Sequence, residues 1–164
     1  MLKRRYLLIA GAGGAAALAA LRFGMPAPRA AAAHFEVMHT DAEWRAMLTP
    51  QQYNVLRQSG TERPYSSPLD KEKRAGTFAC AGCKLALFSS ETKFDSRTGW
   101  PSFWKPLDNA VATEADNSLG MSRDGVHCRQ CGGHLGHVFN DGPPPTGLRY
   151  CMNGVAMTFT PRAA

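Results

Sequence analysis

Two pairs of cysteines, each with two residues between its members, most strongly constrain how this chain can fold. They are Cys80 with Cys83 and Cys128 with Cys131. A tight turn with this spacing directs two sulfur atoms at one ion, and two such turns complete a tetrahedral structural zinc site. Residues 84–127 separate the pairs, a longer gap than in a compact zinc finger, so a folded domain has to bring the two turns together.

The N-terminal residues 1–33 have the composition of an export signal. Basic residues 3–5 precede an Ala- and Gly-rich apolar run over 6–21, which is too short for the roughly 20 residues of a membrane-spanning helix. Small residues at 30–33 form a cleavage pattern, and Arg4-Arg5 resembles a twin-arginine signal. We expect cleavage near Ala33. An uncleaved membrane anchor and an ordinary signal for unfolded chains are the alternatives.

The net charge of the chain belongs mostly to this N-terminal segment. Of 19 basic and 13 acidic residues, residues 1–33 contain five basic ones and no acidic one. The rest therefore has 19 − 5 = 14 basic and 13 acidic residues, a net charge of +1. Nucleic-acid-binding domains usually carry a clustered excess of basic residues. We expect an exported, periplasmic or extracytoplasmic protein that binds no nucleic acid and has no stable membrane association after signal removal.

Two short helices are predicted near the start of the remaining chain. Residues 34–39 form a lead-in without a strong pattern, and the main domain is expected over 40–164. Thr40 with Glu43, and Thr49 with Gln52, are capping-box pairs. We expect the second helix to stop at Gly60. A hydrophobic staple is expected between Leu48 and Tyr53.

Beyond Gly60 the chain has the texture of a β-rich domain. Gly and Pro recur every few residues between short apolar segments such as 77–79, 85–88 and 155–159, and no window sustains helical periodicity over three turns. The prediction is a mainly β fold. We expect short antiparallel strands in two packed sheets, with two or three short N-terminal helices and a four-cysteine zinc site.

The paired cysteines have a second interpretation. In an oxidising compartment each pair can form a disulfide, and a C-x-x-C disulfide is more typical of redox motifs than of structural staples. The small residues Ala81 and Gly82 inside the first pair, and Gly132 and Gly133 after the second, suit metal-binding turns. We favour structural zinc, and keep disulfides or redox-active pairs as the alternative.

Cys151 is left as an odd fifth cysteine, which suggests a reactive thiol. If 147–154 is a strand, alternation places Arg149, Cys151 and Asn153 on one face. A nearby guanidinium favours the thiolate, which is the nucleophilic form. The alternative is a buried structural cysteine that acts as a small hydrophobic residue.

Two histidines, His134 and His137, form a second polar cluster. Four cysteines already complete a zinc site, so we do not expect the histidines to bind that metal. An imidazole can exchange a proton near neutral pH. The alternative is a pair of hydrogen-bonded structural histidines.

Six motifs in order resemble the peptide methionine sulfoxide reductase B family, over about residues 44–161. They are Thr61-Glu62-Arg63-Pro64, the segment from Phe78 to Cys83, Lys93-Phe94-Asp95-Ser96, Gly99-Trp100-Pro101-Ser102-Phe103, the segment from Gly133 to Phe139, and the segment from Arg149 to Asn153. One such motif would carry little weight, whereas six in order are highly specific. The resemblance implies reduction of the R epimer of methionine sulfoxide, free or in proteins, and hence repair of oxidised exported proteins under oxidative stress.

The resemblance also implies a role for each site residue. Cys151 would attack the sulfoxide sulfur and become a sulfenic acid, with Arg149 stabilising its thiolate. His134, His137 and Asn153 would hold the sulfoxide oxygen or a nearby water. His137 is the expected proton donor. The indole of Trp100 would pack on the substrate methyl group, Phe139 would line the pocket or serve as a core aromatic, and the paired cysteines would hold structural zinc.

Two positions depart from the family pattern. Thr98 stands where members that form an internal disulfide often carry a cysteine, so we expect reduction by a small thiol or a thioredoxin-like partner. Gly154 stands where a serine commonly follows the asparagine, and we expect only a small local effect. We expect a monomer.

Two other classes of protein remain as alternatives. One is a non-catalytic zinc-knuckle binding module, and the other is an exported thiol–disulfide oxidoreductase. The first disagrees with the low charge of residues 34–164, and the second disagrees with the glycine-rich surroundings of the cysteine pairs.

Overall fold

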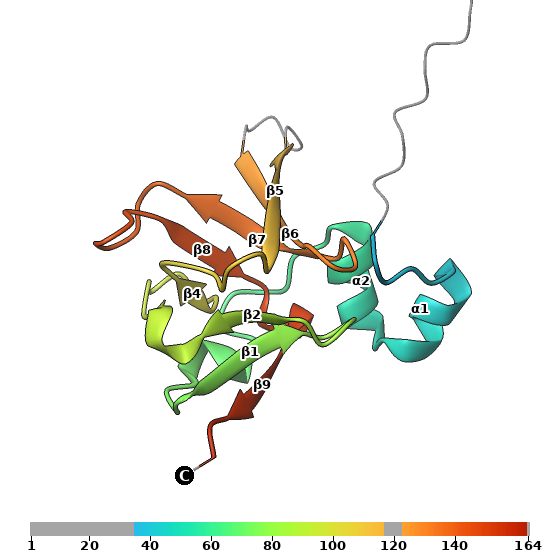
Figure 1. Cartoon of the computed structure of the whole chain (residues 1–164), viewed down its shortest axis with the longest axis horizontal. Helices are drawn as coiled ribbons and strands as arrows, with labels where there is room; N and C mark the ends of the chain where they lie inside the picture. Colours follow the sequence, from blue (N-terminus) through green and yellow to red (C-terminus); the bar gives the residue numbers. More distant parts are fainter. Residues whose placement is uncertain (1–34, 117–122, 164) are drawn as a thin grey trace, which may run out of the picture. The chain divides into compact units, whose positions relative to one another are not determined.

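Two antiparallel sheets dominate the computed structural model of the chain, which describes residues 35–116 and 123–163 (Figure 1). The proposed signal segment and the boundary after Ala33 therefore lie outside the described residues. The smaller sheet has the strand order β2-β1-β9, and the larger has the order β3-β4-β8-β7-β6-β5. The predicted mainly β fold with two sheets is confirmed.

The strands are short, as the spacing of Gly and Pro predicts. In chain order they are β1 (Gly76–Cys80), β2 (Ala86–Ser89), β3 (Lys93–Phe94), β4 (Ser102–Phe103), β5 (Val111–Asp116), β6 (Arg123–Cys128), β7 (His134–Phe139), β8 (Arg149–Met152) and β9 (Met157–Pro161). Short 3-10 helices occur at η1 (Pro68–Lys71), η2 (Ser90–Thr92) and η4 (Gly154–Ala156).

Aromatic side chains from both sheets meet in the core. Phe78 of β1 and Phe88 of β2 are opposite each other in the smaller sheet, and both contact Phe103 of β4 in the larger one. The ring centroids of Phe88 and Phe103 are 4.3 Å apart in a stacked arrangement. All three rings are fully buried, so this contact holds the two sheets together through the hydrophobic effect.

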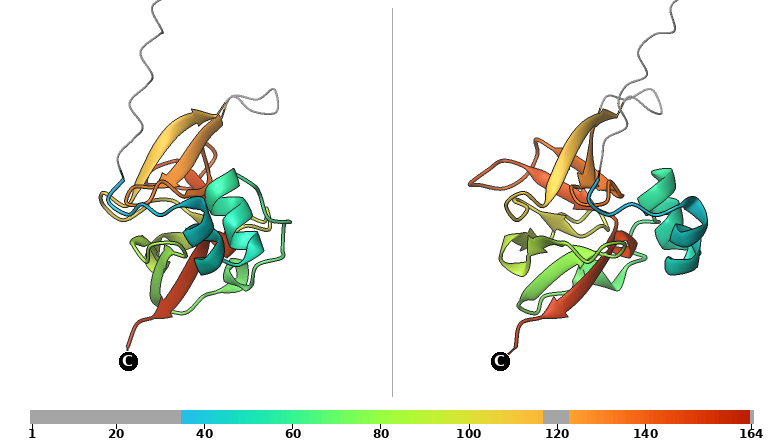
Figure 2. Two further views of the ribbon diagram at one scale, coloured as in Figure 1. Left: turned by 90° about the vertical axis from the view of Figure 1, so that its right-hand side faces the viewer. Right: turned by 45° about the vertical axis from the view of Figure 1, so that its right-hand side comes forward.

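Two helices lie beside the sheets (Figure 2). They are α1 (Asp41–Met47) and α2 (Pro50–Gln58), and each begins with the predicted capping box, at Thr40 and Thr49. Ser59, in the left-handed region with φ of 54°, ends α2 one residue before the predicted stop. α2 packs against β7 and η4, which places it behind the strand that carries the two histidines.

Residues 155–159, which the sequence predicts as a short strand, differ from this expectation at their start. Val155 and Ala156 belong to η4, and the strand β9 begins only at Met157. The Glu62 carboxylate accepts hydrogen bonds from the backbone N–H groups of Gly154 and Val155, which keeps them out of a sheet ladder. Among the described residues, no helix is both long and apolar enough to cross a membrane.

Candidate functional site

The four paired cysteines form one cluster that joins the end of β1 to the end of β6. All four sulfur atoms lie within 4.8 Å of one another. The sulfur atoms of Cys83 and Cys128 are 3.4 Å apart, and those of Cys80 and Cys131 are 3.8 Å apart. Tetrahedral Zn–S bonds of about 2.3 Å give S–S separations of about 3.8 Å. The donor set and its spacing therefore fit a four-thiolate metal ion.

The two cysteine turns share one backbone geometry. Lys84 follows the first pair with φ of 67°, and Gly132 follows the second with φ of 68°. Their N–H groups donate to the carbonyl oxygens of Cys80 and Cys128 at 2.9 and 2.8 Å. The sulfur contacts described above connect the two turns, and none of the five cysteines is in a disulfide. This arrangement favours metal binding over a disulfide within each pair.

Cys151 lies in the middle of the larger sheet, in β8 between β4 and β7. It is opposite Ser102 of β4 and His137 of β7. The side chains around it enclose a cavity of about 130 Å³. This cavity is lined by Thr61, Trp100, Arg123, Gly136, His137, Phe139, Cys151 and Asn153. The structure thus brings five of the seven predicted catalytic and substrate-binding residues into one hollow.

Burial raises the pKa of the Cys151 thiol. A hydrogen bond from Thr98 and the positive charge of Arg149 act in the opposite direction, with a smaller contribution from Ser102. The expected influence of Arg149 is present, but burial outweighs it. In the substrate-free protein the thiol form of Cys151 is therefore favoured at neutral pH.

A chain of hydroxyl groups leads to the Cys151 sulfur. Ser102 donates to the carbonyl oxygen of Trp100 at 3.1 Å, and Ser96 lies 2.7 Å from Ser102 and 2.8 Å from Thr98. Because Ser102 donates to Trp100 and Ser96 donates to Ser102, Ser96 can only accept from Thr98. The Thr98 proton can therefore be given either to Ser96 or to the Cys151 sulfur, 3.9 Å away. Sequence reasoning missed Ser96 and Ser102 in this role, because serine near a turn carries no distinctive signal.

His134 and His137 lie on the same side of the sheet because β7 contains a bulge. In an unbroken strand, residues three apart point to opposite faces. Here His127 pairs with His134, whereas the adjacent Val126 pairs with Gly136, so Leu135 is an extra residue in β7. The ring centroids of His134 and His137 are 5.2 Å apart. The bulge re-aims one imidazole toward the other, as bulges beside functional sites often do.

Each histidine has a different electrostatic setting. The Nε2 atom of His137 lies 2.7 Å from a carboxylate oxygen of Asp116, which also accepts from Arg123 at 3.0 Å. His134 is only 4% exposed, and its Nε2 atom has no hydrogen-bond partner in the described chain. Burial first, then the charges of His127 and His137, lower the pKa of His134 to about 4. His134 is therefore neutral at physiological pH.

Asp116 is a site residue that sequence reasoning missed. It ends β5, while His137 lies in β7, so the contact depends on β6 between them and on its register with both neighbours. The sequence shows only an acidic residue at this position. No local pattern connects it to a histidine.

Arg149 is held by a carboxylate and an aromatic ring. Its Nε and Nη2 atoms donate to the two oxygens of Asp141 at 2.9 and 2.8 Å. Its guanidinium carbon lies 4.4 Å from the centroid of the Phe139 ring. The ion pair with Asp141 and the stacking on Phe139 fix the position of the Arg149 guanidinium. Arg149 lies two residues before Cys151 in the same strand.

Trp100 and Asn153 complete the cavity from loops. The indole Nε1 of Trp100 donates to the carbonyl oxygen of Glu62 at 3.2 Å. Asn153 is 3% exposed and lies just after β8, at the start of η4, so the strand ends before it. It still lines the cavity with Cys151, although strand alternation is not what places it there.

Gly154 has a steric reason to be glycine. A Cβ atom added to it would lie 2.1 Å from Oγ of Ser67 and 2.5 Å from Cβ of Ser67. The Ser67 hydroxyl accepts from the N–H of Leu69 at the start of η1. Glycine at position 154, in place of the serine common in the family, therefore leaves the space that the Ser67 side chain occupies.

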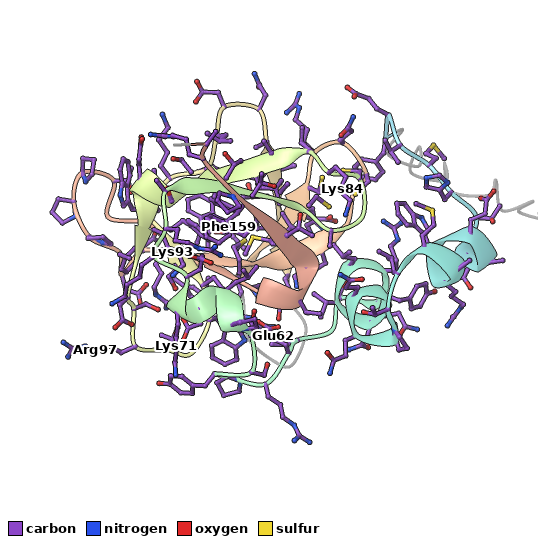
Figure 3. All side chains as sticks on the ribbon, turned by 90° about the horizontal axis from the view of Figure 1, so that it is seen from below. Glu62, Lys71, Lys84, Lys93, Arg97 and Phe159 are labelled. Atoms are coloured by element: carbon purple, nitrogen blue, oxygen red, sulfur yellow. The ribbon has the colours of Figure 1, made fainter. Side chains whose placement is uncertain are left out.

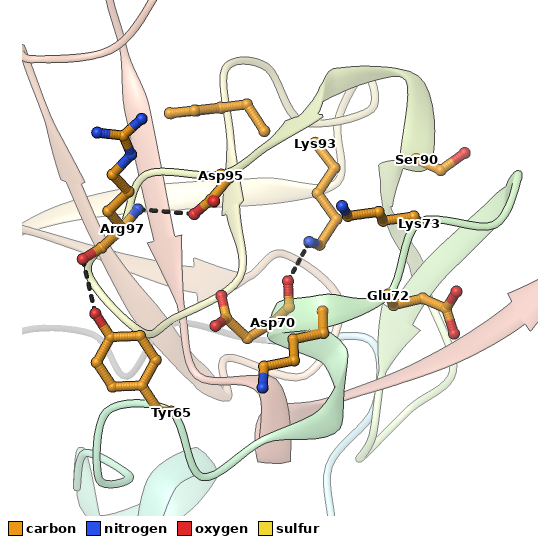
Figure 4. A pocket seen from close by; sticks show the side chains of 10 residues that line it. Tyr65, Asp70, Glu72, Lys73, Ser90, Lys93, Asp95 and Arg97 are labelled. Atoms are coloured by element: carbon orange, nitrogen blue, oxygen red, sulfur yellow. Dashed lines mark hydrogen bonds between the residues drawn. The ribbon is translucent and has the colours of Figure 1, made fainter.

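A larger cavity lies elsewhere in the described residues. About 740 Å³ in volume, it is bordered by Lys71, Lys93 and Arg97 and contains none of the predicted site residues. The Tyr65 hydroxyl donates to the carbonyl oxygen of Arg97 at 2.9 Å across its edge (Figure 4). This bond restrains the loop that presents Thr98 to Cys151.

A half-buried cysteine that shares a cavity with a histidine and an indole, in a β domain with a four-cysteine metal cluster, defines a thiol-dependent enzyme. The family model described as SelR domain matches residues 48–161. The chain belongs to this family of MsrB-type oxidoreductases.

Three similar proteins are each named peptide methionine sulfoxide reductase MsrB. The protein of Pseudomonas putida (strain W619) is 60% identical over 121 residues, covering 73% of this chain and 91% of the relative. The protein of Agrobacterium fabrum is 52% identical over 127 residues, covering 77% and 94%. The protein of Methanosarcina mazei is 52% identical over 126 residues, covering 76% and 90%.

Proposed function

We propose that this chain reduces the R epimer of methionine sulfoxide, free or in proteins, to methionine. The observation that carries the proposal is the cavity in which Cys151 faces Trp100 and His137. An indole offers a flat apolar surface for a methyl group, and the thiol opposite it offers a nucleophile. Placing the methyl group on the indole leaves only one orientation in which the sulfoxide oxygen points to the imidazole. That restriction is the basis for choosing one epimer.

The first chemical step transfers one oxygen atom. The Cys151 sulfur attacks the sulfoxide sulfur as His137 gives a proton to the sulfoxide oxygen. The protonated oxygen then moves from the methionine sulfur to the Cys151 sulfur, the bond between the two sulfurs breaks, and methionine leaves. The methionine sulfur is reduced by two electrons, and the Cys151 sulfur is oxidised by two electrons to a sulfenic acid. Because the Cys151 thiol loses its own proton, no net proton is consumed. Asn153 and the neutral His134 hold the oxygen or a water beside it.

The second step uses an external reductant. Thr98, not a cysteine, lies beside Cys151, and the remaining four thiols form the metal cluster. Two thiols from a small-molecule reductant or a thioredoxin-like protein therefore reduce the sulfenic acid. The products are the Cys151 thiol, one disulfide and one water molecule.

The cysteine cluster is proposed to hold one structural zinc ion. Cys80, Cys83, Cys128 and Cys131 would supply four thiolates, a donor set that suits zinc. Bound zinc stabilises the folded chain and takes no part in the oxygen transfer. The ion ties the end of β1 to the end of β6, and so ties one sheet to the other.

We also propose that the protein works outside the cytoplasm as a monomer. The support is the sequence of residues 1–33, with its basic start, apolar run and small residues before Ala33. Twin-arginine export carries folded proteins, which is compatible with loading the metal before export. Substrates would then be exported proteins whose methionines have been oxidised.

Turnover of separated epimers tests the proposed function. The protein without residues 1–33 is mixed with each epimer of N-acetyl methionine sulfoxide and dithiothreitol, beside Cys151→Ser. We expect methionine product from the R epimer only, and none from Cys151→Ser. Turnover by both variants would contradict the role of Cys151. Disulfide exchange without sulfoxide reduction would favour an oxidoreductase that uses a cysteine pair.

A further inference from the structure

The start of the short helix η4 is capped by a residue far away in the chain. The first N–H groups of a helix need acceptors, and an asparagine at the N-cap usually supplies one. Asn153 occupies this position but makes no such side-chain bond. The Glu62 carboxylate replaces it, accepting from Gly154 at 2.6 Å and from Val155 at 3.0 Å. Glu62 lies against this helix in Figure 3.

Because Glu62 performs the capping, the amide of Asn153 is turned to other partners. Its Oδ1 atom accepts from the backbone N–H of Glu62 at 2.9 Å. Its Nδ2 atom donates to the carbonyl oxygen of Leu135, the bulge residue of β7, at 3.0 Å. One Nδ2 proton remains for the cavity that Asn153 lines. The amide is thereby held in a single orientation beside Cys151.

The same residue holds the indole on the other side of the cavity. The Nε1 atom of Trp100 donates to the backbone carbonyl oxygen of Glu62 at 3.2 Å. Glu62 therefore uses its N–H for Asn153, its C=O for Trp100 and both carboxylate oxygens for η4. Four hydrogen bonds from one residue connect two walls of the cavity around Cys151.

The carboxylate of Glu62 is half-buried, and burial raises its pKa against the opposing effect of the two backbone N–H groups. A partly desolvated carboxylate is costly without partners, so these hydrogen bonds hold it in place. Shortening the side chain would weaken both hydrogen bonds to η4, and converting it to an amide would leave one of the N–H groups of Gly154 and Val155 without its acceptor.

We propose that Glu62 is a positioning residue of the sulfoxide site, which orients Trp100 and Asn153 for substrate by capping η4. The inference rests on the proposed reductase function for its kinetic consequences, but not for its structural ones. Glu62 does not line the cavity around Cys151, so its effect on substrate passes through these two side chains.

The variant Glu62→Gln tests this role with little change in shape. A glutamine can accept from one N–H group with its oxygen, but its amide group cannot accept from the other. Loss of one charge-assisted hydrogen bond predicts a loss of about tenfold in kcat/KM for the R epimer, mainly through a higher KM. Glu91→Gln is the matched control, because the Glu91 carboxylate forms an exposed ion pair with Arg162 and does not line the cavity around Cys151. We expect its kinetics to be unchanged.

Nuclear magnetic resonance provides the readout that does not depend on activity. In Glu62→Gln the indole N–H resonance of Trp100 and the side-chain amide resonances of Asn153 should shift. The chemical shifts of the Trp44 and Trp104 indole N–H groups should stay unchanged. The metal content and the melting temperature should be close to those of the unsubstituted protein. If the wild-type protein reduces no sulfoxide, the proposed reductase function is refuted. The chemical shifts still test whether Glu62 orients Trp100 and Asn153.

Two results would overturn the inference. One is unchanged Trp100 and Asn153 resonances together with unchanged KM in Glu62→Gln. The other is a loss of activity that only follows a fall in the folded fraction, with normal KM for the molecules that remain folded. Glu62→Asp adds a graded variant, since it keeps the charge but shortens the reach, and it should fall between wild type and Glu62→Gln.

Discussion

The hydroxyl oxygen of Thr98 lies 3.9 Å from the sulfur of Cys151, at the end of a chain of hydroxyl groups. This contact is the first of the influences that lower the pKa of Cys151 against the dominant effect of burial. Thr98 stands where some members of the family carry a resolving cysteine, and its hydroxyl lowers the pKa of Cys151 instead. The hydroxyl favours the charged form of the sulfur.

Replacing Thr98 with valine should raise the pKa of Cys151 further. The shape is kept but the hydroxyl is lost, so the rate of Cys151 alkylation by iodoacetamide at neutral pH should fall by up to about tenfold. The pH profile of alkylation, followed by mass spectrometry of the metal-bound protein, should move to higher pH. Thr113→Val, on an exposed strand position, is the control. An unchanged profile in Thr98→Val would exclude this role.

Asp116→Asn should slow turnover without changing the reactivity of the Cys151 thiol. The carboxylate lies 2.7 Å from Nε2 of His137, so it orients the imidazole for proton transfer, an effect typically worth tenfold or more. We expect kcat to fall by about tenfold while alkylation of Cys151 stays the same. The control is Asp108→Asn, at an exposed pair with Lys105. Equal losses in both assays would indicate a general disturbance instead.

His134 should make the stability of the fold depend on pH. Its pKa falls from 6.5 to about 4, so the unfolded chain binds more protons between these values. The free energy of unfolding should therefore be highest above pH 6.5 and should decrease by about 3 kcal/mol on going below pH 4. Urea unfolding at several pH values measures this change.

The variant His134→Gln separates this contribution from the effect of acid on the metal cluster. It should show a smaller loss of stability between pH 7 and pH 4 than wild type does, whereas His39→Gln, at an exposed position, should behave as wild type. Parallel pH curves for wild type and His134→Gln would show that the buried imidazole is not the cause.

Removing one ligand of the cysteine cluster should destabilise the whole domain. Cys128→Ser breaks the four-thiolate set at the end of β6, and structural zinc commonly supplies a large part of the folding free energy. We expect loss of bound metal and a melting temperature lower by roughly 10 °C or more. Cys151→Ser should keep its metal. Full metal content in Cys128→Ser would refute the assignment of the ligand.

Local patterns in the sequence predict much of this protein. The capping boxes at Thr40 and Thr49 depend on residues three positions apart, so the helix starts are correct. The cysteine turns are equally local, and the free thiols gather as their spacing suggests. The stop of α2 differs by one residue, because Ser59 adopts the left-handed conformation expected of Gly60.

Contacts between strands that are far apart in the chain could not be predicted from local sequence patterns. The bulge at Leu135, which aligns His134 with His137, depends on the register between β6 and β7. The contact of Asp116 with His137 and the capping of η4 by Glu62 join segments that are far apart in the chain. Acidic residues are common at surfaces, so neither has a local signature.

The central claim is that Cys151 takes the oxygen from the sulfoxide. The most direct test is a single turnover without reductant, using one equivalent of the R epimer and mass spectrometry of dimedone-trapped protein. We predict one methionine released per protein molecule and one trapped sulfenic acid, located at Cys151, with the four clustered thiols unmodified. Release of methionine with a disulfide from Cys151 to a cluster cysteine, or with no modification of Cys151, would contradict the account.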